Sequence, residues 1–180
     1  MNYKNRQGPW MELQSGKRFY PLDFRPEDVD INDIASGLAR ESRFNGQFRL
    51  DVPFYSVAQH SVIGSRLCPD KYARLFLAHD ATEAYSKDLP KPLKILLPEY
   101  EKMEKEWFKT IAIHFNLPRI LTPEFKVYDT KMLFTERRDV MNKSSNLWED
   151  EVEPFDFKIK DFWLPQKARE EFLKRFYELF

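Results

Sequence analysis

Apolar side chains recur at intervals of three or four residues along most of the chain, and this spacing is typical of amphipathic helices. Residues that cap helices, or prolines suited to a first helical turn, mark the start of several of these segments. The segments begin at Asp30, Ser56, Asp70, Thr122 and Pro165. A further long amphipathic segment runs from Glu99 to Phe115, and the helix that starts at Thr122 is expected to reach about Met141. The pattern therefore predicts a mainly α-helical protein.

The N-terminal part of the chain departs from this helical period. Two short runs, Trp10–Leu13 and Lys17–Tyr20, flank the tripeptide Gln14-Ser15-Gly16. This arrangement predicts a short β-hairpin with a glycine-containing turn. Because a two-stranded hairpin is marginally stable alone, we expect it to pack against the helices.

Three segments lack a clear period and are predicted to be irregular. Ser42 to Pro53 reads as a loop, and Asn142 to Lys160 is acidic, aromatic and aperiodic. Asp88 to Pro92 is expected to form a rigid loop, because each proline fixes its own φ and restricts the residue before it. None of these segments looks like a linker between domains, so we expect residues 1–180 to form one domain.

Composition narrows the classes of function. The 180 residues include 29 basic and 29 acidic side chains, so there is no net positive field of the kind that binds a nucleic-acid polymer or an anionic membrane. A small local phosphate pocket remains compatible with this balance. No apolar run approaches the roughly 20 residues that span a bilayer, and the first ten residues lack the apolar run of a signal peptide. The single cysteine excludes an internal disulfide and a four-thiolate zinc site, so a reducing cytoplasm is the expected compartment.

Polar side chains interrupt three predicted helix faces that should otherwise be apolar. These side chains are His60, the pair His79-Asp80, and Asp129. Buried charge is costly unless it is paired or bound to a metal ion. Two imidazoles and two carboxylates form a suitable nitrogen and oxygen shell for a divalent cation. The site would use two of the three histidines in the chain.

Glu83 follows His79 by four residues on the helix predicted to start at Asp70, so the two side chains are expected to lie on the same face. A carboxylate on the open side of a metal ion suits a general acid or base. Each feature also has an ordinary explanation. A buried histidine is often simply hydrogen-bonded in the core, a His-Asp dipeptide is common, and Asp129 could be a surface carboxylate. The combination of all of them carries the metal hypothesis.

This order of residues resembles the HD-domain metal-dependent phosphohydrolases. The segment 55–61 is similar to the family's first-ligand segment, and segments 77–85 and 88–94 resemble the 5′-deoxynucleotidase branch. The block 10–19 looks like phage-encoded members, including short dATP triphosphohydrolases. The resemblance covers about residues 9–141 and implies an HD-domain helical bundle with a short N-terminal β-hairpin.

The resemblance also implies roles for individual residues. The implied metal ligands are His60, His79, Asp80 and Asp129, which would hold one divalent ion: zinc, cobalt, manganese or magnesium. The implied catalytic residues are Glu83 and Asp88. The implied substrate contacts are Arg43, Phe44, Lys91 and Lys94, and Arg18 is a further basic group that could meet a longer phosphate chain.

Differences from related HD-domain families reduce the number of activities and metal ions that the resemblance allows. Ala84 follows Glu83 where the alarmone hydrolases have a second acid, and the Gly-Tyr-Pro signature of the cyclic-dinucleotide phosphodiesterases is absent from the chain. Dinuclear members need further histidines between His79 and Asp129, and only His114 is available there, for which a structural role is expected. One protein-held ion is therefore predicted, and a second ion carried by the substrate phosphates is left open.

The predicted function is hydrolysis of deoxynucleoside triphosphates, with dATP favoured, to a deoxynucleoside and triphosphate. The alternatives are a 5′-deoxynucleotidase acting on monophosphates and, in another class, a metal-bound nucleotide sensor without turnover. A two-iron oxygenase is disfavoured by the histidine count. By family analogy we expect a dimer or a hexamer, located in the cytoplasm or, for a phage-encoded protein, in the host cytoplasm.

Overall fold

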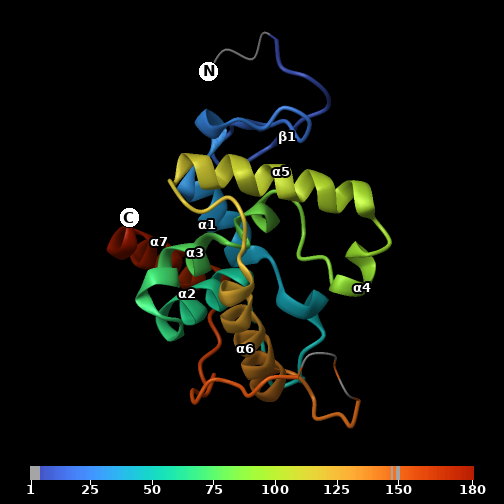
Figure 1. Ribbon diagram of the computed structural model, residues 1–180, viewed down its shortest axis with the longest axis vertical. Helices are drawn as coiled ribbons and strands as arrows, with labels where there is room; N and C mark the ends of the chain where they lie inside the picture. Colours follow the sequence, from blue (N-terminus) through green and yellow to red (C-terminus); the bar gives the residue numbers. More distant parts are fainter. Residues whose placement is uncertain (1–4, 147, 149–150) are drawn as a thin grey trace.

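The computed structural model describes residues 5–146, 148 and 151–180, and it is mainly helical, as the sequence predicts (Figure 1). Its α-helices are α1 (Ile31–Arg40), α2 (Val57–Leu67), α3 (Asp70–Ala78), α4 (Lys91–Lys94), α5 (Pro98–His114), α6 (Pro123–Val140) and α7 (Pro165–Leu179). Three short 3₁₀ segments join them: η1 (Pro26–Asp28), η2 (Arg43–Gly46) and η3 (Ala81–Ala84). No helix in this described part of the chain is both long enough and apolar enough to cross a membrane.

The helix starts follow the predicted caps. The side chains of Asp30, Ser56 and Thr122 each accept a hydrogen bond from a backbone N–H in the first turn of α1, α2 and α6. A cap of this kind stabilises a helix by about 1 kcal/mol. The sequence therefore places these three helices to within a residue or two of their observed bounds.

The predicted hairpin is present and packs on the helices. Strand β1 (Met11–Glu12) pairs antiparallel with β2 (Arg18–Phe19), with Met11 opposite Phe19. The Phe19 ring is buried and stacks on Tyr85, with 4.8 Å between ring centres, and meets the edge of Trp107 of α5. Burial of this one aromatic ring anchors a strand pair that would be marginal alone.

Helices α1, α2, α3 and α7 contact one another in the centre of the molecule, and α5 crosses above them in Figure 1 while α6 descends from them. Two apolar clusters fill the interior. One includes Ile34, Leu38, Ile111 and Phe172, and the other includes Phe76, Phe125 and Met132. The second cluster lies directly beneath the predicted metal ligands, because Phe76 and Phe125 both contact the His79 ring.

One expected helix ends earlier than predicted. Helix α3 stops at Ala78, and the chain then passes through His79 and Asp80 into η3, so Glu83 does not lie on the same α-helix as His79. The backbone of Asp80 (φ −96°, ψ 13°) leaves the α-helical region, and Glu83 N–H bonds the Asp80 carbonyl in a 3₁₀ turn.

Tertiary packing favours this break, because η3 lies against α1. At Gly37 of α1, an added Cβ would come within 2.6 to 2.7 Å of Ala84. A contact this close admits only glycine, and it holds the 3₁₀ segment that carries Glu83.

The segments predicted to be irregular are partly ordered. The segment from Asp88 to Pro92 is not wholly a loop, because the short helix α4 begins at Lys91 with Pro92 in its first turn. Within the loop 42–53, η2 contains Phe44 and Asn45 with left-handed φ angles. In the segment 142–160 the described residues form neither helix nor strand, and Leu147, Glu149 and Asp150 lie outside the described residues.

Candidate metal centre

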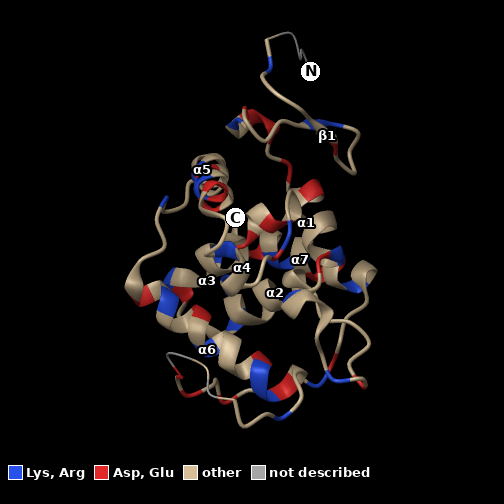
Figure 2. Cartoon of the chain, turned by 90° about the vertical axis from the view of Figure 1, so that its right-hand side faces the viewer, with Lys and Arg blue, Asp and Glu red and all other residues tan. Residues whose placement is uncertain are grey.

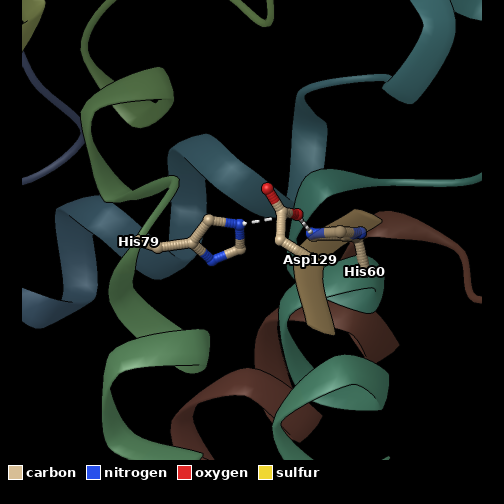
Figure 3. Close-up of side chains that lie close together, drawn as sticks. All are labelled: His60, His79 and Asp129. Carbon is tan, nitrogen blue, oxygen red and sulfur yellow. Dashed lines mark ion pairs between the residues drawn. The ribbon is translucent and has the colours of Figure 1, made fainter. Parts of the chain in front are cut away.

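Three elements bring two histidines and an aspartate together. His60 projects from α2, His79 stands at the C-terminal end of α3, and Asp129 lies on α6; their side chains converge in Figure 3. One potential ligand atom from each residue lies within 4.8 Å of the others. Both histidines are buried. The three residues form a group that could bind a metal ion, as the sequence predicts.

Asp80, the fourth predicted ligand, lies against the same two histidines. Its Oδ1 is 3.3 Å from His79 Nε2, and its Oδ2 is 3.5 Å from His60 Nε2. Asp129 Oδ1 is 3.3 Å from His79 Nε2 and 3.9 Å from His60 Nε2. The two Nε2 atoms therefore face two carboxylates that come from different elements.

The chemistry of these atoms fits a divalent cation. Both Nε2 atoms are buried and neither has a hydrogen-bond partner among the described residues. A buried polar atom without a partner is costly, and a metal ion would satisfy both nitrogens at once. A set of two imidazoles and two carboxylates suits several first-row divalent ions.

Each imidazole is oriented through its other nitrogen. His79 Nδ1 lies 2.7 Å from the Phe76 carbonyl oxygen, and His60 Nδ1 lies 2.7 Å from Glu136 Oε1. Because both partners are acceptors, each Nδ1 is assigned the proton, which leaves a lone pair on Nε2 of the neutral ring. The histidines are thus held in the tautomer that ligates through Nε2.

The cluster shifts the proton equilibria of its members. Burial lowers the pKa of His79, but the carboxylates of Asp80 and Asp129 outweigh it and raise that pKa to about 9. Burial raises the pKa of Asp129, but His79 and His60 outweigh it and hold that pKa below its ordinary value. In the metal-free protein, a pKa of about 9 favours a second proton on His79 at neutral pH, on Nε2, and this proton must leave before that nitrogen can ligate.

Glu83 lies beside this cluster on η3 and lines the same cleft as Asp80 and Asp129. Burial, together with the charges of Asp80 and Asp88, raises the pKa of Glu83 well above its ordinary range. Its Oε2 atom is buried and has no hydrogen-bond partner among the described residues. A raised pKa favours the protonated carboxyl group, which is the form that can donate a proton.

Arg43, predicted to bind phosphate, reaches the cluster from η2. Its Nη1 lies 3.1 Å from Asp88 Oδ2 and 3.8 Å from Asp80 Oδ2, and its Nη2 lies 3.2 Å from Glu136 Oε2. The guanidinium also lies over the Phe44 ring, 5.5 Å from its centre. The structure therefore brings Arg43 and Asp88 next to the predicted ligands.

These groups open into a cleft of about 840 Å³ between α5, α6 and the segment around α4. Lys91 and Lys94, the predicted phosphate contacts, both line it, and Lys94 Nζ forms an ion pair with Glu104 at 2.8 Å. Further cations from α5, α6 and the connection between them also line it: Lys102, Lys105, Lys109, Arg119 and Lys126. A cleft of this size is in the range that encloses a small organic ligand.

Two predicted substrate contacts are not brought to this cleft. Phe44 is absent from its lining, and its ring lies 6.5 Å from that of Trp148. Arg18 is on the hairpin, where its guanidinium carbon lies 4.1 Å from the centre of the Trp10 ring. The hairpin packs on the far side of α5, so Arg18 does not meet the metal cluster (Figure 1).

Glu136 is the site residue that sequence reasoning missed. The charged run 136–139 makes two separate contacts, because Glu136 pairs with Arg43 and Arg138 pairs with Asp139 at 2.7 Å. The signal available was spacing, since Glu136 follows Asp129 by seven residues and so lies two helical turns along the same face. His114 has the expected structural role, with its Nδ1 2.6 Å from the Pro26 carbonyl oxygen.

Replacement of a predicted ligand should abolish metal binding. We expect one Co²⁺ or Zn²⁺ per chain in the wild type, and loss of at least about 100-fold in affinity in His60→Ala or Asp129→Ala, because each substitution removes a ligand. Isothermal titration calorimetry and metal analysis after dialysis measure this. His114→Ala is the matched control and should bind like the wild type; undiminished binding by His60→Ala would refute the ligand set.

Metal affinity should also rise with pH. The proton on His79, whose pKa is raised to about 9, must leave when the nitrogen ligates, so protons compete with the metal below that pH. Affinity should therefore fall about tenfold for each pH unit below 9. Calorimetry in buffers of different ionisation enthalpy should detect release of about one proton at pH 7; affinity that is constant between pH 7 and 9 would contradict the assignment.

Comparison with known proteins places the chain in a family. No protein-family model matches it. It is 33% identical over 125 residues to an uncharacterized protein of Rhodobacter capsulatus, which covers 65% of this chain and 63% of the relative. It is 44% identical over 134 residues, 74% of each chain, to the uncharacterized protein YfdR of Escherichia coli K12. This identity and coverage show that the chain belongs to the same protein family as YfdR.

Proposed function

We propose that this protein is an HD-type, metal-dependent phosphohydrolase that removes the 5′-phosphate chain from deoxynucleotides. The observation that carries the proposal is the convergence of two unpartnered imidazole nitrogens with two carboxylates beside a buried glutamate and a buried arginine. Such a set combines a cation site, a proton donor and an anion-binding group in one cleft. The proposed first substrate is a deoxynucleoside triphosphate, with dATP favoured.

His60, His79, Asp80 and Asp129 would hold the divalent ion. When bound, that ion supplies Lewis-acid stabilisation of phosphate charge and makes water nucleophilic near neutral pH. The protein contributes fixed orientation, because both histidines are anchored through Nδ1 and buried among aromatic rings.

Arg43 is placed to bind the phosphate that reacts. Its guanidinium is a planar fork of donors suited to phosphate oxygens. Asp88 occupies Nη1 at 3.1 Å, so an incoming phosphate would take over this contact while Glu136 keeps hold of Nη2. Negative charge that develops on the phosphate oxygens is then stabilised by a cation already in position.

Glu83 is placed to move the proton. Hydrolysis joins a water oxygen to phosphorus and breaks the bond from phosphorus to the 5′-oxygen, which then needs a proton to leave as a hydroxyl group. The raised pKa of Glu83 keeps that proton available at neutral pH. A non-catalytic nucleotide sensor would need the cation site but no such carboxyl group, so Glu83 favours an enzyme over a sensor.

The basic side chains of the cleft help to decide whether the substrate is a triphosphate or a monophosphate. Lys91, Lys102 and Arg119 line the cleft and form no ion pair within the described ranges, so they are available to the outer phosphates of a triphosphate. In contrast, Lys94, Lys105 and Lys109 are each neutralised by a glutamate of α5. The first observation supports a triphosphate substrate, and the second keeps the monophosphate as the alternative.

A substrate panel tests the proposal directly. Purified protein with Co²⁺, Mn²⁺ or Zn²⁺ should convert dATP to deoxyadenosine and triphosphate, identified by chromatography. If phosphate is released from deoxynucleoside monophosphates and no product forms from triphosphates, the protein is a 5′-deoxynucleotidase and not a triphosphohydrolase. Absence of turnover with every nucleotide tested would contradict both and leave the sensor.

Glu83→Gln should abolish most activity and leave the metal site intact. General acid–base catalysis contributes about 10² to 10⁴-fold, so kcat should fall by that order. Co²⁺ affinity should stay within about threefold of the wild type, because Glu83 is not a ligand in this scheme. Glu99→Gln, an exposed carboxylate on α5, is the control; loss of metal in Glu83→Gln would show that the residue is a ligand instead.

A further inference from the structure

Glu136 is a fully buried carboxylate that does not line the cleft. It lies on α6 two turns after Asp129, and its side chain has no solvent exposure. Both of its oxygens are engaged, Oε1 with His60 Nδ1 at 2.7 Å and Oε2 with Arg43 Nη2 at 3.2 Å. It is therefore positioned behind the site, in contact with a residue from α2 and a residue from η2.

The contact with His60 differs in kind from the one that orients His79. His79 donates to a neutral backbone carbonyl, whereas His60 faces a carboxylate. A carboxylate partner fixes the tautomer and makes the opposite nitrogen a stronger ligand. Glu136 therefore acts on the electron pair of His60 Nε2, and not only on the direction of the ring.

The contact with Arg43 holds the side of the guanidinium that points away from the cleft. Asp88 and Asp80 lie near Nη1 and line the cleft, and Glu136 lies at Nη2. A phosphate can displace the cleft-side contacts without disturbing the one behind. Glu136 thus keeps Arg43 aimed at the reacting phosphate in both the free and the occupied site.

A contribution to protein stability does not by itself explain a buried carboxylate at position 136. Removal of two charges from water is costly, and apolar residues of similar volume often replace a buried ion pair without loss of stability. Asp139, one turn further along α6, shows the purely structural case: it binds Arg138 and the Ile159 N–H and touches no group of the site. The two carboxylates therefore form a matched pair on one helix.

We propose that Glu136 is a positioning residue that links the two halves of the site, setting His60 to ligate the metal through Nε2 and aiming Arg43 at the substrate phosphate. The metal half of this inference rests only on the candidate metal centre. The phosphate half rests on the proposed function.

Glu136→Gln tests the inference with almost no change in shape. A glutamine side chain places an NH₂ donor where Glu136 has one of its two acceptor oxygens, so it cannot reproduce the contacts with both the His60 Nδ1–H and Arg43. We expect Co²⁺ affinity to fall about 10- to 100-fold. We also expect affinity of the Co²⁺-loaded protein for inorganic triphosphate to fall by roughly tenfold, since Arg43 then bonds a neutral amide oxygen in place of a carboxylate.

The tautomer of His60 provides a readout independent of activity. The chain has three histidines, so the ¹⁵N resonances of the imidazoles can be assigned by substitution. At alkaline pH, metal-free wild type should show His60 protonated on Nδ1, and Glu136→Gln should shift His60 toward protonation on Nε2, while His79 stays unchanged. Glu136→Asp retains the charge and should restore part of the metal affinity, and it replaces Glu136→Gln if that variant does not fold.

Asp139→Asn is the control and should lower stability without changing the His60 tautomer or Co²⁺ affinity. Equal loss of metal affinity in both variants, or no change in tautomer and affinity in Glu136→Gln, would overturn the inference. If the wild type binds Co²⁺ but neither binds triphosphate nor turns over nucleotides, the proposed function fails and the metal half is still decided by the tautomer and the Co²⁺ titration. Unchanged triphosphate affinity in Glu136→Gln, with binding intact in the wild type, would refute the phosphate half alone.

Discussion

Mutual repulsion among carboxylates is the constraint around which this structure is built. Carboxylates of α6, of η3 and of the turns beside η3 surround a single buried guanidinium: Asp80, Glu83, Asp88, Asp129 and Glu136. Such a concentration of negative charge is unfavourable unless cations balance it or protons neutralise part of it. The molecule uses both means. Arg43 and His79, whose pKa is raised to about 9, balance the charge, and the raised pKa of Glu83 favours its neutral form.

A divalent cation would relieve the same constraint. It would replace the proton on His79, satisfy the two unpartnered imidazole nitrogens and neutralise Asp80 and Asp129. The metal site and the proton donor of the proposed mechanism would then have one origin, because the charges that favour a cation also raise the pKa of Glu83. The candidate metal site and the shifted pKa values are thus properties of one cluster.

Close backbone packing at a few positions holds the residues of this cluster together. Gly37 lets η3 approach α1, and left-handed backbone at Phe44 and Asn45 turns η2 so that Arg43 enters the interior. Figure 2 shows acidic and basic residues interspersed along the described part of the chain, which agrees with its overall neutrality. The carboxylates gathered around Arg43 are a local departure from this even distribution.

The sequence by itself determined the helical class, the caps at Asp30, Ser56 and Thr122, and the hairpin, because these depend on residues close together in the chain. The sequence also identified the candidate ligands, since a histidine or aspartate on an otherwise apolar helix face can be recognised from the spacing of residues alone. Local spacing could not show that α3 ends at Ala78, because that break depends on the packing of η3 against α1. Nor could it show that Arg18 lies away from the cleft, or that Glu136 stands between His60 and Arg43. Those facts depend on contacts between segments up to 93 residues apart, and only the folded arrangement of α2, η2 and α6 decides them.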